Sequence, residues 1–200
     1  MRIILATRNQ HKIKEIENIL ADYQIEILTL KDFPDLPEVE EIGETLEENA
    51  VLKAKSIFNA TGIPALADDS GLEVDALDGA PGVMSARFAG PGCSYEDNNL
   101  KLLGLLKGIP EERRGASFRC VVALTLSSDD IRVVEGRVRG FITHKEIGEN
   151  GFGYDPVFFY PELDKTFAEL KPEEKNRISH RGIAFRKAKE LIKRIMTDNE

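Results

Sequence analysis

The sequence contains only two cysteines, Cys93 and Cys120, and no apolar run near the roughly 18 residues that a membrane-spanning helix needs. Two isolated cysteines argue against a structural zinc site and favour reduced thiols in a cytosolic chain. The apolar run Ile3–Ala6 that follows Met1-Arg2 is too short for a signal peptide. We therefore expect a cytoplasmic chain that does not enter a membrane.

The chain also lacks an excess of basic residues, because 35 acidic residues outnumber 27 Lys and Arg and give a net charge of -8. A broad nucleic-acid surface normally carries positive charge, so we expect no nucleic-acid partner. A small anionic ligand stays compatible, because a metal and a few local basic side chains can hold a triphosphate. With 200 residues and 42% hydrophobic content, the chain can bury a core without disulfides or structural metals to stabilise it.

The first half of the sequence alternates strands and helices. The apolar run Arg2–Ala6 predicts a buried strand, and Ile13 and Ile16 continue at helical spacing. The other elements predicted here are a strand at Ile25–Leu30, a connection at Lys31–Val39, a helix capped by Thr45 and Glu48 and stopped by Gly62, a short strand at Ala65–Ala67, a separate strand at Leu72–Leu77, a long structured loop at Gly79–Gly92 and a helix from Ser94 to Leu106.

The second half is richer in strands. Alternating apolar residues in Ser117–Leu126 predict a half-buried strand, and Ile131–Phe141 returns as a strand broken at Gly136. An amphipathic helix is expected from about Ser179 to Met196. The pattern predicts an α/β fold in which a long central mixed sheet is flanked by helices, in two lobes. No linker is visible, so we expect residues 1–200 to form a single domain.

A polar segment, Thr7–Lys12, lies between the first strand and its helix. A helix N-terminus offers unpaired backbone N–H groups and the positive end of the helix dipole, which suit a phosphate. The segment has neither P-loop nor GxGxxG spacing. The alternative is a helix cap with exposed polar side chains.

Carboxylates gather on both sides of the second predicted helix. Those before it are Glu38, Glu40, Glu41 and Glu44, where acidic side chains also favour the helix dipole. Asp68-Asp69-Ser70-Gly71 follows a short apolar strand, and sites in α/β proteins usually form at strand ends. Since Mg²⁺ prefers carboxylate and phosphate oxygens, we expect a site here. The alternative is an Asx-turn into Gly71.

Two later segments combine aromatic and basic residues. Gly151–Pro156 holds two aromatics between glycines and could form a rigid loop on which a base stacks, or a tight turn that packs its aromatics into the core. Glu174–Arg181 offers Lys175, His180 and Arg181 as donors for carbonyl oxygens and phosphate, or simply a helix cap at Ser179 with solvated neighbours.

Taken together, these segments resemble the inosine triphosphate pyrophosphatase family, also described as the dITP/XTP pyrophosphatases. The matching segments are Ala6–Lys12, Glu40–Gly43, Asn49-Ala50 with Lys53-Ala54, Ala67–Leu72, Gly79–Gly82 with Ser85–Arg87, Gly151–Pro156 and Glu174–Arg181. Each segment is weak evidence, whereas all of them in this order are very specific. Many members have Gly in place of Arg8 and Thr in place of Ile42, and neither change removes a group that the chemistry needs.

The resemblance implies a two-lobed α/β fold with an elongated sheet, an active-site cleft between the lobes and a homodimer. It implies Mg²⁺-dependent hydrolysis of ITP, dITP or XTP between the α and β phosphates, which removes them before incorporation into DNA or RNA. The implied phosphate contacts are Thr7, Arg8, Asn9, Gln10, His11, Lys12 and Lys53. The implied metal ligands are Glu40 and Asp69, with Asp69 also the general base. Ser70 would touch the substrate, and the implied base pocket is Phe152, Gly153, Tyr154, Asp155, Lys175, His180 and Arg181.

One carboxylate cannot easily be both an inner-sphere ligand and a free base, so the sequence leaves open how Asp68 and Asp69 divide these roles. A donor from His180 or Arg181 at C6 would favour hypoxanthine and xanthine over adenine, and a donor near C2 would reject guanine. Two other function classes stay open. One is a metal-dependent pyrophosphatase related to the septum-inhibitor family, which would favour modified pyrimidines or standard nucleotides. The other is a non-catalytic nucleotide-binding or regulatory protein.

Overall fold

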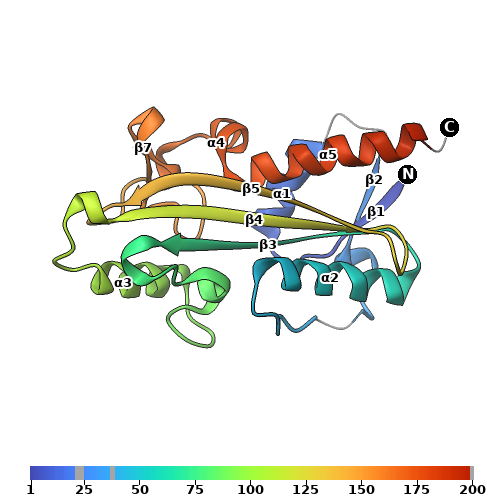
Figure 1. The fold of residues 1–200 in the computed structure, drawn as a ribbon, viewed down its shortest axis with the longest axis horizontal. Coiled ribbons are helices and arrows are strands. Elements are labelled where there is room, and N and C mark those ends of the chain that lie inside the picture. Colours follow the sequence, from blue (N-terminus) through green and yellow to red (C-terminus); the bar gives the residue numbers. More distant parts are fainter. Residues whose placement is uncertain (21–24, 37–38, 199–200) are drawn as a thin grey trace. The chain divides into compact units, whose positions relative to one another are not determined.

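The computed structural model describes residues 1–20, 25–36 and 39–198 (Figure 1). Within them, seven strands form one sheet in the order β2-β1-β3-β4-β5-β6-β7. The strands are β1 (Arg2–Leu5), β2 (Glu26–Thr29), β3 (Ala65–Val74), β4 (Gly115–Thr125), β5 (Ile131–Ile142), β6 (Phe158–Tyr160) and β7 (Lys165–Thr166). The α-helices are α1 (Gln10–Leu20), α2 (Leu46–Thr61), α3 (Tyr95–Leu105), α4 (Pro172–Ile178) and α5 (His180–Asp198).

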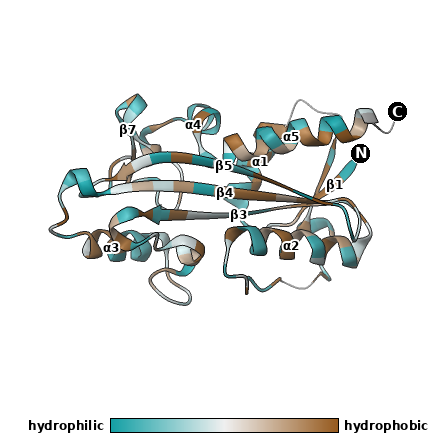
Figure 2. Ribbon diagram, in the orientation of Figure 1, coloured by the Kyte–Doolittle hydropathy of each residue, from teal (hydrophilic) through white to brown (hydrophobic). Residues whose placement is uncertain are grey.

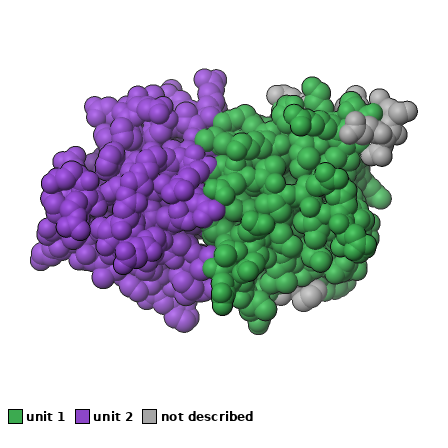
Figure 3. Space-filling model, in the orientation of Figure 1, with its two compact units in different colours: residues 1–69, 120–136, 181–200 green, residues 70–119, 137–180 purple. Residues whose placement is uncertain are grey.

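The chain divides into two compact units, which Figure 3 shows in different colours. Unit 1 comprises Met1–Asp69, Cys120–Gly136 and Arg181–Glu200, and unit 2 comprises Ser70–Arg119 and Arg137–His180. In unit 1, β1 pairs in parallel with β2 and β3. Strand β6 belongs to unit 2 and pairs antiparallel with β5 and β7. The predicted α/β fold with a mixed sheet is therefore confirmed. The elongated shape, the cleft and the single domain stay predictions.

In unit 1, helices cover both faces of the strands: α1 and α5 lie on one face and α2 on the other (Figure 1). The core under α1 and α5 consists of apolar side chains from β1, β3, β4 and the two helices. Its members are Ile3, Leu5, Ile16, Leu20, Leu66, Cys120, Val122, Leu124, Ala184, Phe185, Ala188 and Ile192. Figure 2 shows hydrophobic and hydrophilic bands alternating along α2 and α5, as expected for helices with one buried face. No helix in the described part of the chain is long and apolar enough to cross a membrane.

The predicted helix boundaries around α2 are confirmed by the capping contacts. The Thr45 hydroxyl accepts from the Glu48 backbone N–H at 3.1 Å, and the Glu48 carboxylate accepts from the Thr45 N–H at 3.1 Å. Gly62 ends the helix in the left-handed region, with φ of 68°. A capping box between Ser94 and Asp97 starts α3 in the same way. These local signals are strong because they satisfy backbone groups that a helix terminus leaves unpaired.

The structure corrects three strand predictions. The strand expected at Ala65–Ala67 and the first part of the strand expected at Leu72–Leu77 form one strand, β3, so Asp68–Gly71 does not lie at a strand end or in an Asx-turn. The rest of the second segment, Asp75–Leu77, is a 3₁₀ turn. The strand persists through two aspartates because both are paired with cations. The break expected at Gly136 is absent from β5. Helix α4 and strands β6 and β7 were not predicted, because they are short and depend on tertiary packing.

The core of unit 2 contains an aromatic cluster. The Phe118 ring lies 4.5 Å from Phe158 and 5.8 Å from Phe167, measured between ring centroids. The predicted structured loop at Gly79–Gly92 contains a 3₁₀ turn over Gly82–Arg87. Ser85 ties this turn to β3, because its hydroxyl donates to Gly82 O at 2.6 Å and accepts from the Leu72 N–H at 2.9 Å.

Candidate active site

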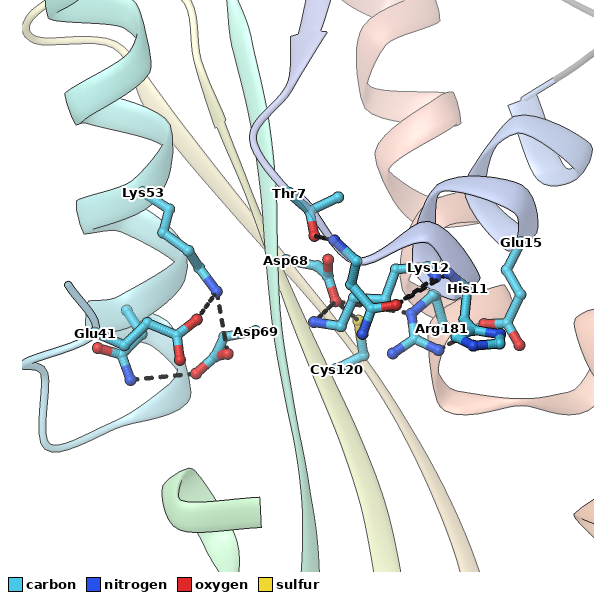
Figure 4. Close-up of polar contacts among 12 residues, drawn as sticks. Thr7, His11, Lys12, Glu15, Glu41, Lys53, Asp68, Asp69, Cys120 and Arg181 are labelled. Carbon is cyan, nitrogen blue, oxygen red and sulfur yellow. Dashed lines mark hydrogen bonds and ion pairs between the residues drawn. The ribbon is translucent and has the colours of Figure 1, made fainter. Parts of the chain in front are cut away.

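Asp68 and Asp69 are neighbours in β3, and their side chains lie on opposite faces of the strand (Figure 4). Successive side chains of a strand alternate between faces, so Asp68 shares the α1 and α5 face with Leu66, and Asp69 faces α2. Both residues are almost fully buried, with 1% of the surface of Asp68 and 6% of that of Asp69 exposed. The two carboxylates therefore belong to two different clusters in unit 1.

The Asp69 cluster contains two contacts from α2. The Lys53 ammonium lies 3.1 Å from Asp69 Oδ1, and the Asn49 amide donates to Asp69 Oδ2 at 3.2 Å. Lys53 also contacts a Glu41 carboxylate oxygen at 2.5 Å, so one cation bridges two carboxylates. Asn49 and Lys53 are four residues apart and so lie on one face of the helix.

Burial and charge act in opposite directions in this cluster. Burial raises the pKa of Asp69, Lys53 opposes it and Glu41 adds to it, and the net result is a pKa above the ordinary value. Burial alone would lower the pKa of Lys53, but the carboxylates of Asp69, Asp68 and Glu41 outweigh it and raise this pKa. Lys53 is thus held as a cation beside a carboxylate whose proton affinity is enhanced.

The Asp68 cluster is a buried network of charges on the other face. Asp68 Oδ2 lies 2.8 Å from the Lys12 ammonium and 3.7 Å from Arg181 Nε. Arg181 Nη1 donates to a Glu15 carboxylate oxygen of α1 at 2.6 Å. Burial alone would raise the pKa of Asp68, but Lys12 and Arg181 hold it well below its usual range. A carboxylate held this way is a poor proton acceptor, so the structure favours Asp68 as an anchor for the two cations.

The segment before α1 is capped from within. The Asn9 side-chain oxygen accepts from the backbone N–H groups of His11 and Lys12 at 3.0 and 3.3 Å, and the Asn9 N–H donates to the Thr7 hydroxyl at 3.3 Å. These contacts agree with the alternative interpretation, in which the segment caps the helix. No acceptor for the backbone N–H of Arg8 or Gln10 is found among the described residues. These N–H groups and the positive end of the α1 dipole are the groups that favour an anion at a helix N-terminus.

The side chains of this segment differ in their surroundings. Arg8, Gln10 and His11 are exposed, whereas Thr7 and Lys12 are half-buried. Arg8 donates to the Leu36 carbonyl at 2.8 Å, so its guanidinium contacts its own chain here.

The acidic residues before α2 are not equivalent. Glu41 contacts Lys53, whereas Glu40 is exposed and has no hydrogen bond or ion pair among the described residues. Glu38 lies outside the described residues. No group of three or more His, Cys, Asp and Glu side chains that could hold a metal by itself occurs in the part of the chain that the structure describes. The carboxylates of Asp69 and Glu41 are the donor type that Mg²⁺ uses when phosphate oxygens complete its coordination.

Unit 2 brings together most residues predicted for the base pocket. Asp155 accepts from the Phe152 backbone N–H at 2.8 Å and pairs with the Lys175 ammonium at 2.5 Å, and both charged side chains are buried. The same ammonium lies 4.8 Å from the centroid of the Phe152 ring, a cation–π distance. Tyr154 is buried and its hydroxyl donates to Ser85 O at 2.9 Å. The loop at Gly151–Pro156 is thus rigidly tied, while Phe152 stays half-buried.

The remaining residues predicted to contact the substrate are His180, Arg181 and Ser70. The His180 ring stacks on Phe118, with centroids 4.5 Å apart and planes 9° apart, and is 3% exposed. Arg181 is buried in the Asp68 cluster of unit 1, and Ser70 is half-buried in β3 directly after Asp69. In these contacts the Arg181 guanidinium is paired with the carboxylates of Asp68 and Glu15.

Sequence reasoning assigned no specific role to three residues of these clusters, Glu15, Asn49 and Glu41, although Asn49 and Glu41 lie in segments that it singled out. Helical spacing could have indicated Asn49, since Lys53 lies four residues on. Glu15 likewise follows Lys12 by three residues on α1. Nothing in the local pattern distinguishes Glu41 from Glu40, because that segment precedes the helix without regular structure.

Comparison with known proteins places these observations in context. The model of the Ham1 family matches residues 3–191. A curated dITP/XTP pyrophosphatase from Desulforamulus reducens is 49% identical over 200 residues, covering 100% of both chains. One from Geobacter sulfurreducens is 52% identical over 184 residues, 92% of each chain. The solved structure of a HAM1 protein from Coxiella burnetii superimposes with a TM-score of 0.90 at 40% identity, covering 97% of this chain and 99% of that one.

Proposed function

The chain belongs to the Ham1 family, and we propose that it hydrolyses the deaminated purine nucleoside triphosphates ITP, dITP and XTP to the nucleoside monophosphate and pyrophosphate. Curated relatives at about this chain's full length carry the name dITP/XTP pyrophosphatase, which supports the proposal. The observation in the structure that carries it is the Asp69 cluster. A buried carboxylate with a raised pKa, bonded to a lysine and an amide, suits a general base for water.

The phosphates are assigned to unit 1. The N-terminus of α1 supplies the N–H groups of Arg8 and Gln10 and the positive end of the helix dipole, and Lys12 adds a charge that Asp68 holds in place. Thr7, Asn9 and His11 belong to the same segment as additional phosphate contacts. Lys53 contributes a second cation close to Asp69.

Mg²⁺ is proposed as the cofactor, with Asp69 and Glu40 as its ligands. Glu41 is an alternative to Glu40, because it already lies near Asp69 through Lys53. When bound, the ion would offset the charge that develops on the leaving pyrophosphate. Removal of Mg²⁺ with EDTA is expected to abolish turnover, and turnover that survives EDTA would contradict this assignment.

In the proposed reaction, a water oxygen attacks a phosphorus of the α–β anhydride, and the bridging bond breaks to release pyrophosphate. Asp69 takes the proton of that water, and Lys53 keeps the carboxylate oriented by its contact with Oδ1. Asp68 is not proposed as the base, because Lys12 and Arg181 hold its pKa too low. We therefore assign the base to Asp69 and the anchoring of Lys12 and Arg181 to Asp68. Because Asp69 is also a proposed Mg²⁺ ligand, its two carboxylate oxygens would divide the two roles.

We assign the binding of the substrate's purine base to Ser70, Phe152–Asp155, Lys175 and His180, which all belong to unit 2, and to Arg181. The half-buried Phe152 ring offers a stacking face, and Lys175 is a donor for a base carbonyl. Hypoxanthine and xanthine have a C6 carbonyl where adenine has an amino donor, so donors at this position exclude ATP. A donor near C2 would exclude GTP, whose amino group differs there from the oxygen of xanthine and the hydrogen of inosine.

The homodimer implied by the resemblance and the cytoplasmic location expected from the sequence are part of the proposal. Light scattering on the purified protein measures the first directly, and a monomeric mass would remove it. No nucleic-acid partner is proposed, in keeping with the acidic net charge.

Product analysis of ITP hydrolysis tests the reaction itself. We expect IMP and pyrophosphate in equal amounts, separated by ion-exchange chromatography, with no IDP or orthophosphate as primary products. IDP and orthophosphate would show cleavage of the other anhydride and would sink the proposal. Preference for a methylated pyrimidine triphosphate would favour the septum-inhibitor class, and tight ITP binding without products would favour the binding-protein class.

A further inference from the structure

Helix α3 of unit 2 contacts the proposed base loop with two side chains that lie one helical turn apart. Tyr95 and Asn99 are at positions i and i+4, and so share a face of the helix. The Tyr95 ring lies 5.9 Å from the Phe152 ring between centroids. The Asn99 amide donates to Gly153 O at 3.1 Å and to a Glu146 carboxylate oxygen at 2.6 Å, and Asn99 is 2% exposed.

The other hydrogen bonds and ion pairs of the loop at Gly151–Pro156 involve its side chains and the Phe152 N–H. Asp155 holds the Phe152 N–H and Lys175, and the Tyr154 hydroxyl holds Ser85 O. Among the described residues, the Asn99 bond is the one contact that holds the peptide group joining Gly153 to Tyr154. Gly153 has φ of 64°, a region open to glycine, so the chain itself leaves this peptide free to turn.

The N–H of this peptide group has no acceptor in the described part of the chain, although Tyr154 is only 5% exposed. Buried backbone N–H groups are nearly always paired, so an unpaired one at a predicted binding loop points to a ligand acceptor. The C=O and N–H of a trans peptide point in opposite directions. Because Asn99 holds the C=O, it also sets the direction of the N–H.

From this geometry we infer that Asn99 is a positioning residue for base recognition: it orients the Gly153–Tyr154 peptide so that the Tyr154 N–H donates to an oxo group of a deaminated purine. The inference rests on the proposed function, since it assigns the acceptor to that substrate. Adenine would present an amino group to this donor and leave two donors facing each other. Asn99 would thus favour ITP over ATP without touching either.

The test compares Asn99→Ala with Asn98→Ala. Asn98 is a matched control, because it is the same residue type on the same helix, is also 2% exposed, and bonds Ala86 O and the Ala89 N–H rather than the loop. We expect Asn99→Ala to raise KM for ITP about tenfold with kcat nearly kept, and to lower the ITP-to-ATP ratio of kcat/KM by about tenfold. Inhibition by inorganic tripolyphosphate, which has no base, should not change.

Both alanine variants should lower the melting temperature, and only Asn99→Ala should change the ratio. Should Asn99→Ala fail to fold, Glu146→Ala removes the second acceptor of the Asn99 amide at an exposed position, and about a threefold loss in the ratio is expected. An unchanged ratio in folded Asn99→Ala, or in Glu146→Ala where only that variant folds, would overturn the inference and leave Asn99 a scaffold residue. A wild-type protein that does not hydrolyse ITP would instead end the proposed function, and the inference with it.

Discussion

Replacing Lys53 with Met should shift the pH dependence of catalysis in a defined direction. The variant keeps the apolar stem and removes the ammonium that lies 3.1 Å from Asp69 and 2.5 Å from Glu41. Asp69 and Glu41 would then lose the lysine cation that lies between them, which raises the pKa of Asp69 further. A protonated carboxyl cannot accept a proton from water, so the acid limb of the kcat/KM profile must move to higher pH.

The size of the shift follows from the distance. At an effective dielectric constant of 20, unit charges 3.1 Å apart interact by about 5 kcal/mol. This is an upper bound, because water enters the space and the Asn49 bond remains. The acid limb of the profile should therefore move to higher pH by at least about one pH unit.

The assay is the kcat/KM of ITP hydrolysis between pH 5 and 9 at saturating Mg²⁺. Lys55→Met is the matched control, since Lys55 lies two residues on, on another side of α2, and is half-buried. The acid limb of the kcat/KM profile of this control should coincide with that of the wild type. If the limb of Lys53→Met coincides with that of the wild type, Lys53 does not tune Asp69 and the account of this cluster is wrong.

Three further predictions concern single substitutions. Asp69→Asn should keep the melting temperature and lower kcat by at least about 100-fold, and near-normal turnover would remove Asp69 as base. Asp68→Asn should cost about 3 kcal/mol in urea unfolding at pH 7, because it leaves buried cations unpaired. The pKa of Asp68 is depressed on folding, so its stabilisation exists above the unfolded value and fades as pH falls below about 4. An equal loss at pH 7 and pH 2.5 would contradict this. Gly71→Ala should lower stability by about 2 kcal/mol, since its Cβ would collide with Gly82 O, whereas Gly104→Ala, with open space in α3, should gain about 0.5 kcal/mol.

Local signals predicted the longer helices α1, α2, α3 and α5 well. Capping boxes at Thr45 and Ser94 and the stop at Gly62 depend on contacts within a few residues, so the sequence alone contains them. Strand β3 shows where such signals fail. Asp68 and Asp69 favour a turn locally, and the strand continues only because Lys12 and Lys53 come from helices on its two faces.

The sequence predicted many residues of the candidate site, but not which of these residues contact one another. The sequence indicated both aspartates, Lys12 and Lys53, but their pairing depends on which face of β3 each side chain occupies. Arg181 illustrates the difference: expected as a base-pocket donor, it is buried against Glu15 and Asp68 in unit 1. Its place in the base pocket stays a prediction.

The most direct test of the proposed function is the rate of pyrophosphate release from ITP, XTP, GTP and ATP, each with Mg²⁺ and with EDTA. We predict Mg²⁺-dependent release from ITP and XTP, far faster than from GTP and ATP. Equal rates for all four would keep the phosphate chemistry and contradict the base pocket of unit 2, and no release from any of them would contradict the enzymatic function itself.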